Sequence, residues 1–240
     1  MDQYIGKMLD DRYEILELIG SGGMANVYKA RCHRLNRLVA IKILKSDLAD
    51  NADFRRRFHD ESQAVAQLSH ANIVSVYDVS TNPDLEYIVM ELIDGITLKQ
   101  YMERRGRMDW RESLHFITQI MRGLSHAHSR GIIHRDIKPD NIMVDDACHV
   151  SVLDFGIASE TYGDASEKNM SGTPRFKAPE QWMGDSLTPA ADQYALGGIA
   201  FNMIAGEPPF DAATKDELRS KVLNKVLRSE ERRVGKECRS

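Results

Sequence analysis

Long apolar runs, clustered cysteines and a large excess of one charge are all missing from this sequence of 240 residues. No uninterrupted apolar stretch approaches the ~20 residues that a membrane-spanning helix needs, so we expect no membrane contact from this chain. The three cysteines, Cys32, Cys148 and Cys238, are far apart and form no CxxC pair, which argues against a disulfide framework and a zinc site. The formal net charge of -4 gives no reason to expect nucleic acid as a partner.

The composition is that of an ordinary globular protein, with 42% apolar and 28% charged residues. A chain of this length can form one large domain or two smaller lobes. Neither a signal peptide nor an internal repeat is visible, and the scarce cysteines favour a reducing, cytoplasmic setting. A longer parent protein could still be anchored in a membrane.

A glycine-rich turn stands near the N-terminus. Residues 13–19 and 25–30 are apolar and β-prone, and they flank the Gly-Ser-Gly-Gly run at 20–23, which predicts a β-hairpin. Dinucleotide-binding folds contain similar glycines, but they need a helix after the turn, and here a second strand follows. A flexible hairpin without a ligand is the alternative.

Two charged residues interrupt apolar faces further along the chain. Residues 38–44 predict a third strand, in which Lys42 lies on an apolar face. Residues 54–68 predict a helix, in which Glu61 occupies a position that the periodicity reserves for the core. Because a buried charge is costly unless it is paired, Lys42 and Glu61 are natural partners. The alternative is that both side chains reach water at the rim.

The elements divide the chain into two lobes. Strands over 73–78 and 87–90 complete an expected five-stranded antiparallel sheet with one helix, and the pattern after residue 93 is mainly helical. We therefore predict an α+β fold with a small sheet lobe at 13–93 and a larger, mainly helical lobe at 94–228. The charged segment 229–240 is expected to be disordered or foreign to the domain.

Three helices are predicted in the second lobe. The first begins at a capping box of Asp109 and Glu112. Two others are expected over 190–205, where the sequence is apolar nearly all round, and over 215–227. The predicted apolar stripe of the first helix consists of Trp110, Leu114, Ile117, Met121 and Leu124.

The most polar part of the second lobe is the octet 134–141, which lies between two apolar segments. An ordinary solvated turn would explain its Asp, Asn, Pro and Lys residues. However, Asp154-Phe155-Gly156 follows the next apolar run and brings another carboxylate to a strand end. Two acids and Asn141 could thus converge on one cation.

Together these segments resemble the eukaryotic-type (Hanks-type) serine/threonine protein kinases, most of all the bacterial members. Six motifs occur in the family's order across residues 13–210. They are the glycine-rich loop with Gly20, Gly22, Ala25 and Val27, the strand lysine Lys42, its helical partner Glu61, the loop His134-Arg135-Asp136 with Asn141, Asp154-Phe155-Gly156, and Ala178-Pro179-Glu180.

The resemblance implies ATP and Mg²⁺ as cofactors, with Mn²⁺ as an alternative ion. It implies that Asp136, Lys138, Lys42 and Glu61 are the catalytic residues. It assigns the metal to Asn141 and Asp154. The implied nucleotide-binding residues are Gly20, Ser21, Gly22, Gly23, Val27, Ala40, Lys42, Met90, Glu91, Ile93 and Met143.

The implied acceptors are serine and threonine hydroxyls of proteins, because Lys138 and Thr173 resemble the serine/threonine members. Autophosphorylation between two copies of a homodimer is a further implication. Arg135 resembles the arginine that pairs with a phosphate on the activation loop in many members. The candidate phosphorylation sites are Thr161, Ser166 and Ser171, and we expect only weak dependence on them because acidic residues lie nearby.

Two departures from the family pattern favour an alternative. Phe176 and Lys177 stand where the family usually has a tyrosine and an apolar residue, and further C-terminal helices of the family have no counterpart after the segment 215–227. The second lobe is therefore expected to be incomplete. The alternative function is an inactive truncated fragment or pseudokinase that acts as a nucleotide-binding scaffold. A small-molecule phosphotransferase is disfavoured by Lys138 and the segment 172–180.

Overall fold

The computed structural model describes residues 2–49, 51–80, 85–155 and 174–224. The predictions for the tail at 229–240, for Gly156 and Thr173, and for the three phosphorylation sites therefore lie outside the described residues. None of the helices in the described segments is long and apolar enough to cross a bilayer.

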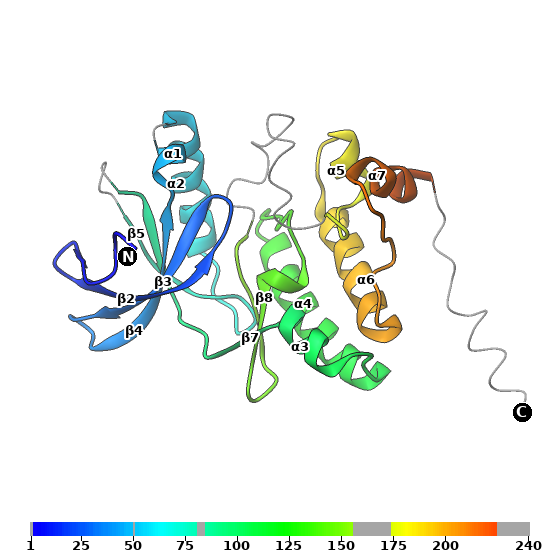
Figure 1. The fold of residues 1–240 in the computed structure, drawn as a ribbon, viewed down its shortest axis with the longest axis horizontal. Helices are drawn as coiled ribbons and strands as arrows, with labels where there is room; N and C mark the ends of the chain where they lie inside the picture. The colour runs from blue at the N-terminus through cyan, green and yellow to red at the C-terminus, as the bar shows by residue number, and fades with distance from the viewer. Residues whose placement is uncertain (1, 50, 81–84, 156–173, 225–240) are drawn as a thin grey trace, which may run out of the picture.

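An antiparallel sheet forms the first part of the chain (Figure 1). The five predicted strands are present, and a two-residue strand pairs with the first of them at the sheet edge, so that the order is β1-β2-β3-β4-β6-β5. The strands are β1 (Met8–Leu9), β2 (Tyr13–Ser21), β3 (Ala25–Cys32), β4 (Arg37–Leu44), β5 (Val76–Val79) and β6 (Tyr87–Met90).

Two helices follow β4 in sequence, a short α1 (Ser46–Ala49) and α2 (Ala52–Ala66). The predicted strand over 73–78 is divided between the two lobes. Its second half joins β5, whereas Val74 donates its N–H to the carbonyl of Val152, 3.0 Å away in the other lobe. The N–H of Val74, in the segment that crosses from one lobe to the other, is thus paired with a strand of the second lobe.

The second lobe consists of helices around a small sheet of strand order β7-β8-β9 (Figure 1). Its core contains Phe116, Ile120 and Ile199, none of which is more than 1% exposed. The elements are β7 (Gly95–Thr97), α3 (Leu98–Arg105), α4 (Trp110–His128), the 3₁₀ turn η1 (Pro139–Asn141), β8 (Ile142–Asp145), β9 (Val150–Val152), α5 (Pro179–Met183), α6 (Pro189–Ala205) and α7 (Lys215–Asn224).

The buried face of α4 agrees only in part with the predicted stripe, since Ile117 and Leu124 pack in the core and the other three residues do not. Trp110, Leu114 and Met121 are more than half exposed, at 56%, 55% and 52%. The polar Gln119 is instead buried, because its side-chain oxygen accepts hydrogen bonds from the N–H of Val150 and the side chain of Asn72. The positions of apolar residues misplace the buried face of a helix when a hydrogen-bonded polar side chain occupies a core position.

The predicted capping box is also only half right. Asp109 caps α4, since its carboxylate accepts from the N–H of Arg111 at 2.8 Å. Glu112 accepts instead from the hydroxyl of Tyr101 at 2.7 Å. Its carboxylate therefore joins α3 to α4 rather than closing the cap.

Contact between α4 and the crossing segment depends on a glycine. A Cβ at Gly123 would lie only 2.9 Å from the carbonyl oxygen of Asn72, whereas a Cβ at Gly197, in the interior of α6, would meet nothing within 4 Å. The segment that joins the lobes can therefore approach α4 closely only where the helix has no side chain.

The two glycines provide a matched test. We expect G197A to raise the free energy of unfolding by about 0.5–1 kcal/mol, the usual gain from glycine to alanine inside a helix. G123A should lower it by about 1–3 kcal/mol, because the backbone must shift to accommodate the methyl group. Urea denaturation of both variants measures the difference. An equal effect of the two substitutions would contradict the close approach.

Candidate active site

A cavity of about 1060 Å³ opens between the sheet lobe and the helical lobe. The glycine-rich hairpin forms one wall, and the loop 134–141 and β8 lie opposite. Most of the predicted site residues reach it. Those that line it are Gly20, Ser21, Gly22, Gly23, Val27, Lys42, Ile93, Asp136, Lys138, Asn141, Met143 and Asp154.

Three predicted nucleotide-binding residues lie behind this lining. Ala40 and Met90 face each other across β4 and β6 and pack in a buried cluster with Val27. Glu91 donates its N–H to the carbonyl of Ser75 at 2.9 Å.

Leu92 and Leu153, which the sequence interpretation did not single out, do line the cavity. A signal for both was present. Leu92 lies between two of the implied nucleotide-binding residues, Glu91 and Ile93, and Leu153 ends the apolar run before Asp154.

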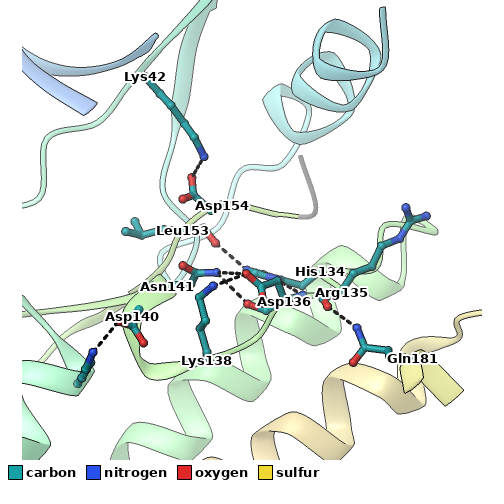
Figure 2. A network of polar contacts seen from close by, with 11 residues as sticks. Lys42, His134, Arg135, Asp136, Lys138, Asp140, Asn141, Leu153, Asp154 and Gln181 are labelled. Carbon is teal, nitrogen blue, oxygen red and sulfur yellow. Dashed lines mark hydrogen bonds and ion pairs between the residues drawn. The ribbon is translucent and has the colours of Figure 1, made fainter. Parts of the chain in front are cut away.

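Lys42 and Asp154 form an ion pair across the cavity, with 2.7 Å between Nζ and Oδ1 (Figure 2). Burial of Asp154 acts to raise the pKa of its carboxyl, but the charge and hydrogen bond of Lys42 outweigh it, and the net pKa lies below the ordinary aspartate value. Asp154 is therefore an anion at neutral pH. Glu61 belongs to α2, but its side chain is outside the description, so its pairing with Lys42 stays a prediction.

A second polar cluster surrounds Asp136 (Figure 2). Its carboxylate accepts a hydrogen bond from the ammonium of Lys138 at 2.6 Å. The side-chain nitrogen of Asn141 donates to the main-chain carbonyl of Asp136 at 2.8 Å and to its carboxylate at 3.1 Å. These contacts use the nitrogen of Asn141, and the atom that can bind a metal ion is its oxygen.

His134 connects the two clusters from beneath. It is fully buried, and burial lowers its pKa, so the ring is neutral at neutral pH. Nε2 lies 2.6 Å from the carbonyl oxygen of Leu153, and Nδ1 lies 3.3 Å from the N–H of Asp136. The partners assign the tautomer: Nε2 donates and Nδ1 accepts. The ring also packs against Phe155, with centroids 4.7 Å apart.

Asp192, at the start of α6, holds the loop from below. Its side chain is 1% exposed, and it accepts hydrogen bonds of 2.8 Å from the N–H groups of His134 and Arg135. The ring of His128 lies at the same distance from the carboxylate. Asp192 therefore holds the neighbouring loop, whereas Thr188 caps α6 by accepting from the N–H of Ala190.

Gln181 is a residue that the sequence interpretation missed. Its side-chain nitrogen donates to the carbonyl of Arg135 at 2.7 Å (Figure 2), and its oxygen accepts from the N–H of Ala178 at 2.9 Å. A signal was available locally, because glutamine is the third residue of a helix that begins with Pro179, where side chains reach back to the helix start. Nothing in the sequence pointed to its second partner.

A profile of the family described as "Protein kinase domain" matches residues 13–238. The chain therefore belongs to the protein kinase domain family. The resemblance drawn from the six motifs is confirmed, and so is the fold class. Membership implies, in general terms, the use of ATP and a divalent metal ion.

Bacterial relatives and a solved structure agree with this assignment. Serine/threonine-protein kinase PrkC of Bacillus subtilis is 43% identical over 221 residues, which cover 91% of this chain and 34% of the relative. Serine/threonine-protein kinase PknB of Mycobacterium tuberculosis is 41% identical, with 84% and 34% covered. The PknI kinase domain of M. tuberculosis has a TM-score of 0.73 at 29% identity, and the match covers 94% of this chain and 92% of that one.

The neutral state of His134 has a consequence for stability. Since burial lowers its pKa, the unfolded chain takes up a proton near the ordinary histidine pKa of about 6.5 and the folded chain does not. The free energy of unfolding should therefore fall as the pH drops from about 7.5 to about 5.5. H134F loses the hydrogen bonds of the ring, so its melting temperature should be lower at every pH. Because it cannot take up this proton, its melting temperature should also depend less steeply on pH. An equal change of melting temperature with pH in the two proteins across this range would contradict a buried neutral ring.

Proposed function

We propose that this domain transfers the γ-phosphate of ATP to serine and threonine hydroxyls of proteins, including those of a second copy of itself. The chain spans about a third of the length of the curated relatives that it matches, at 34% for PrkC. The observation that carries the proposal is the arrangement of two clusters in one cavity, Lys42 with Asp154 and Asp136 with Lys138 and Asn141.

The nucleotide is proposed to lie under the glycine-rich hairpin. Four small residues of the turn, Gly20 to Gly23, line the cavity, so that a chain of phosphates could approach the backbone closely. Lys42 would then neutralise phosphate charge. Val27 and Met143 offer apolar surface from opposite walls for a base. Ala40 and Met90 support that surface from behind, and the main chain at Glu91 and Ile93 would bind the edge of the base.

The donor set fits Mg²⁺, and Mn²⁺ prefers the same oxygen ligands. Asp154 contributes an ionised carboxylate and Asn141 an amide oxygen. Among the residues that the structure describes, no group of three or more His, Cys, Asp or Glu could hold a metal ion, which leaves the other coordination positions to phosphate oxygens and water. The bound ion would neutralise charge on the phosphates.

Asp136 is proposed to orient the acceptor hydroxyl and to receive its proton. Asn141 and Lys138 fix the direction of the carboxylate, and the ammonium of Lys138, 2.6 Å from it, would also approach the transferring phosphate. Such chemistry depends on positioning and charge neutralisation more than on covalent steps. Both clusters therefore have to be held rigidly.

A nucleotide-binding scaffold without transfer is the alternative, and Asp136 distinguishes it. With labelled ATP, Mg²⁺ and a mixed protein acceptor, the purified chain should incorporate phosphate, and D136N should do so ~10²- to 10⁴-fold more slowly, the usual cost of losing a general base. Both proteins should bind ATP equally well, because Asp136 is assigned to the acceptor. Equal labelling would contradict the proposed transfer, and no labelling beside intact ATP binding would favour the scaffold.

A further inference from the structure

Gln181 joins two segments that are far apart in the sequence, and Figure 2 shows its contact with the first of them. One is the loop 134–141, called the catalytic loop below, whose Arg135 carbonyl oxygen accepts from Gln181 at 2.7 Å. The other is the segment 174–178 that leads into α5, reached through the N–H of Ala178 at 2.9 Å. A single amide side chain thus spans both segments with its donor and its acceptor.

The first contact acts on the peptide group that carries Asp136. The carbonyl of Arg135 belongs to the peptide bond between Arg135 and Asp136, so its direction fixes where the catalytic residue begins. Arg135 has a φ of +69°, a left-handed conformation that is unfavourable for an arginine. Such a conformation persists only when neighbours hold it. Asp192 holds the N–H of this residue and Gln181 holds its carbonyl.

The second contact acts on the segment 174–178. Phe176 anchors this segment by packing against the main core, and its ring would lie 3.1 Å from a Cβ at Gly198. Arg175 and Phe176 also line a smaller cavity together with Lys138 of the loop 134–141. The segment therefore lies beside the loop that carries Asp136, and Ala178, at its end, is fully buried.

We propose that Gln181 is a positioning residue that fixes the distance between Asp136 and the acceptor-supporting segment 174–178. This inference rests on the proposed transfer to protein hydroxyls. Gln181 contacts two main-chain groups and none of the reacting atoms, so its effect is exerted through them. The bridge should matter for a protein acceptor, which has to contact both segments, and not for ATP.

The substitution Q181E separates positioning from simple helix capping. The carboxylate of the variant would keep an oxygen for the N–H of Ala178, and carboxylates near a helix start are favourable. It would lose the N–H that donates to Arg135 and would place a second oxygen against that carbonyl. A purely structural cap predicts that Q181E is harmless, whereas the bridge predicts that it is not.

The experiment compares wild type, Q181E and the control Q63E. Gln63 is an exposed residue of α2, hydrogen-bonded locally to His59, so Q63E makes the same chemical change away from the cavity. We expect kcat/KM for the protein acceptor to fall about 10- to 100-fold in Q181E, the scale of a small misplacement of reacting groups. The KM for ATP and the melting temperature should stay close to wild type, and Q63E should match wild type throughout.

Hydrogen exchange makes the outcome independent of catalysis. In Q181E the amide of Ala178 should stay protected, because its cap is kept, while exchange at Asp136 should become faster. Unchanged acceptor kinetics or unchanged exchange at Asp136 would overturn the bridge, as would a loss of activity explained by a matching loss of melting temperature. If the wild type transfers no phosphate, the proposed function fails alone, and the exchange data still decide whether Gln181 holds the loop.

Discussion

The buried carboxylate of Asp192 is the contact on which the site depends most. A carboxylate that is only 1% exposed is costly unless it accepts hydrogen bonds. This one is contacted by two main-chain N–H groups and by the ring of His128. The same contacts hold the start of the loop 134–141 on α6, a helix packed in the core of the second lobe. A polar loop between α4 and β8 thereby gains a fixed position, which phosphoryl transfer requires more than it requires special reactivity.

Hydrogen bonds connect Asp192, through the loop that it holds, to both sides of the cavity. The neutral ring of His134 donates to the carbonyl of Leu153 and accepts from the N–H of Asp136. Leu153 directly precedes Asp154, the proposed metal ligand. Asp154 then meets Lys42 of the sheet lobe. The two lobes are thus connected through a short series of hydrogen bonds and one ion pair, and Gln181 connects the same loop to the segment before α5.

The sequence was sufficient where local chemistry decides the structure. Alternating apolar residues predicted the sheet, and the order of motifs predicted the family, because phosphate and metal binding demand particular residue types. It failed where tertiary contacts override the local pattern. The face of α4 was only partly right because Gln119 is paired in the core, and Gln181 was missed because its partner lies 46 residues away. The pairing of Lys42 with Asp154 was unforeseen for the same reason, since both ends of that contact depend on how the lobes meet.

The role of Asp192 as anchor is tested most directly by amide hydrogen exchange in D192N. An asparagine offers one oxygen and turns an N–H₂ group toward the second main-chain donor, so one of the amides of His134 and Arg135 loses its partner. We predict faster exchange at whichever of the two amides loses its partner and a large loss of phosphate transfer, while ATP binding and the protection of the rest of α6 are retained. Unchanged exchange at His134 and Arg135 together with full transfer activity would contradict the account.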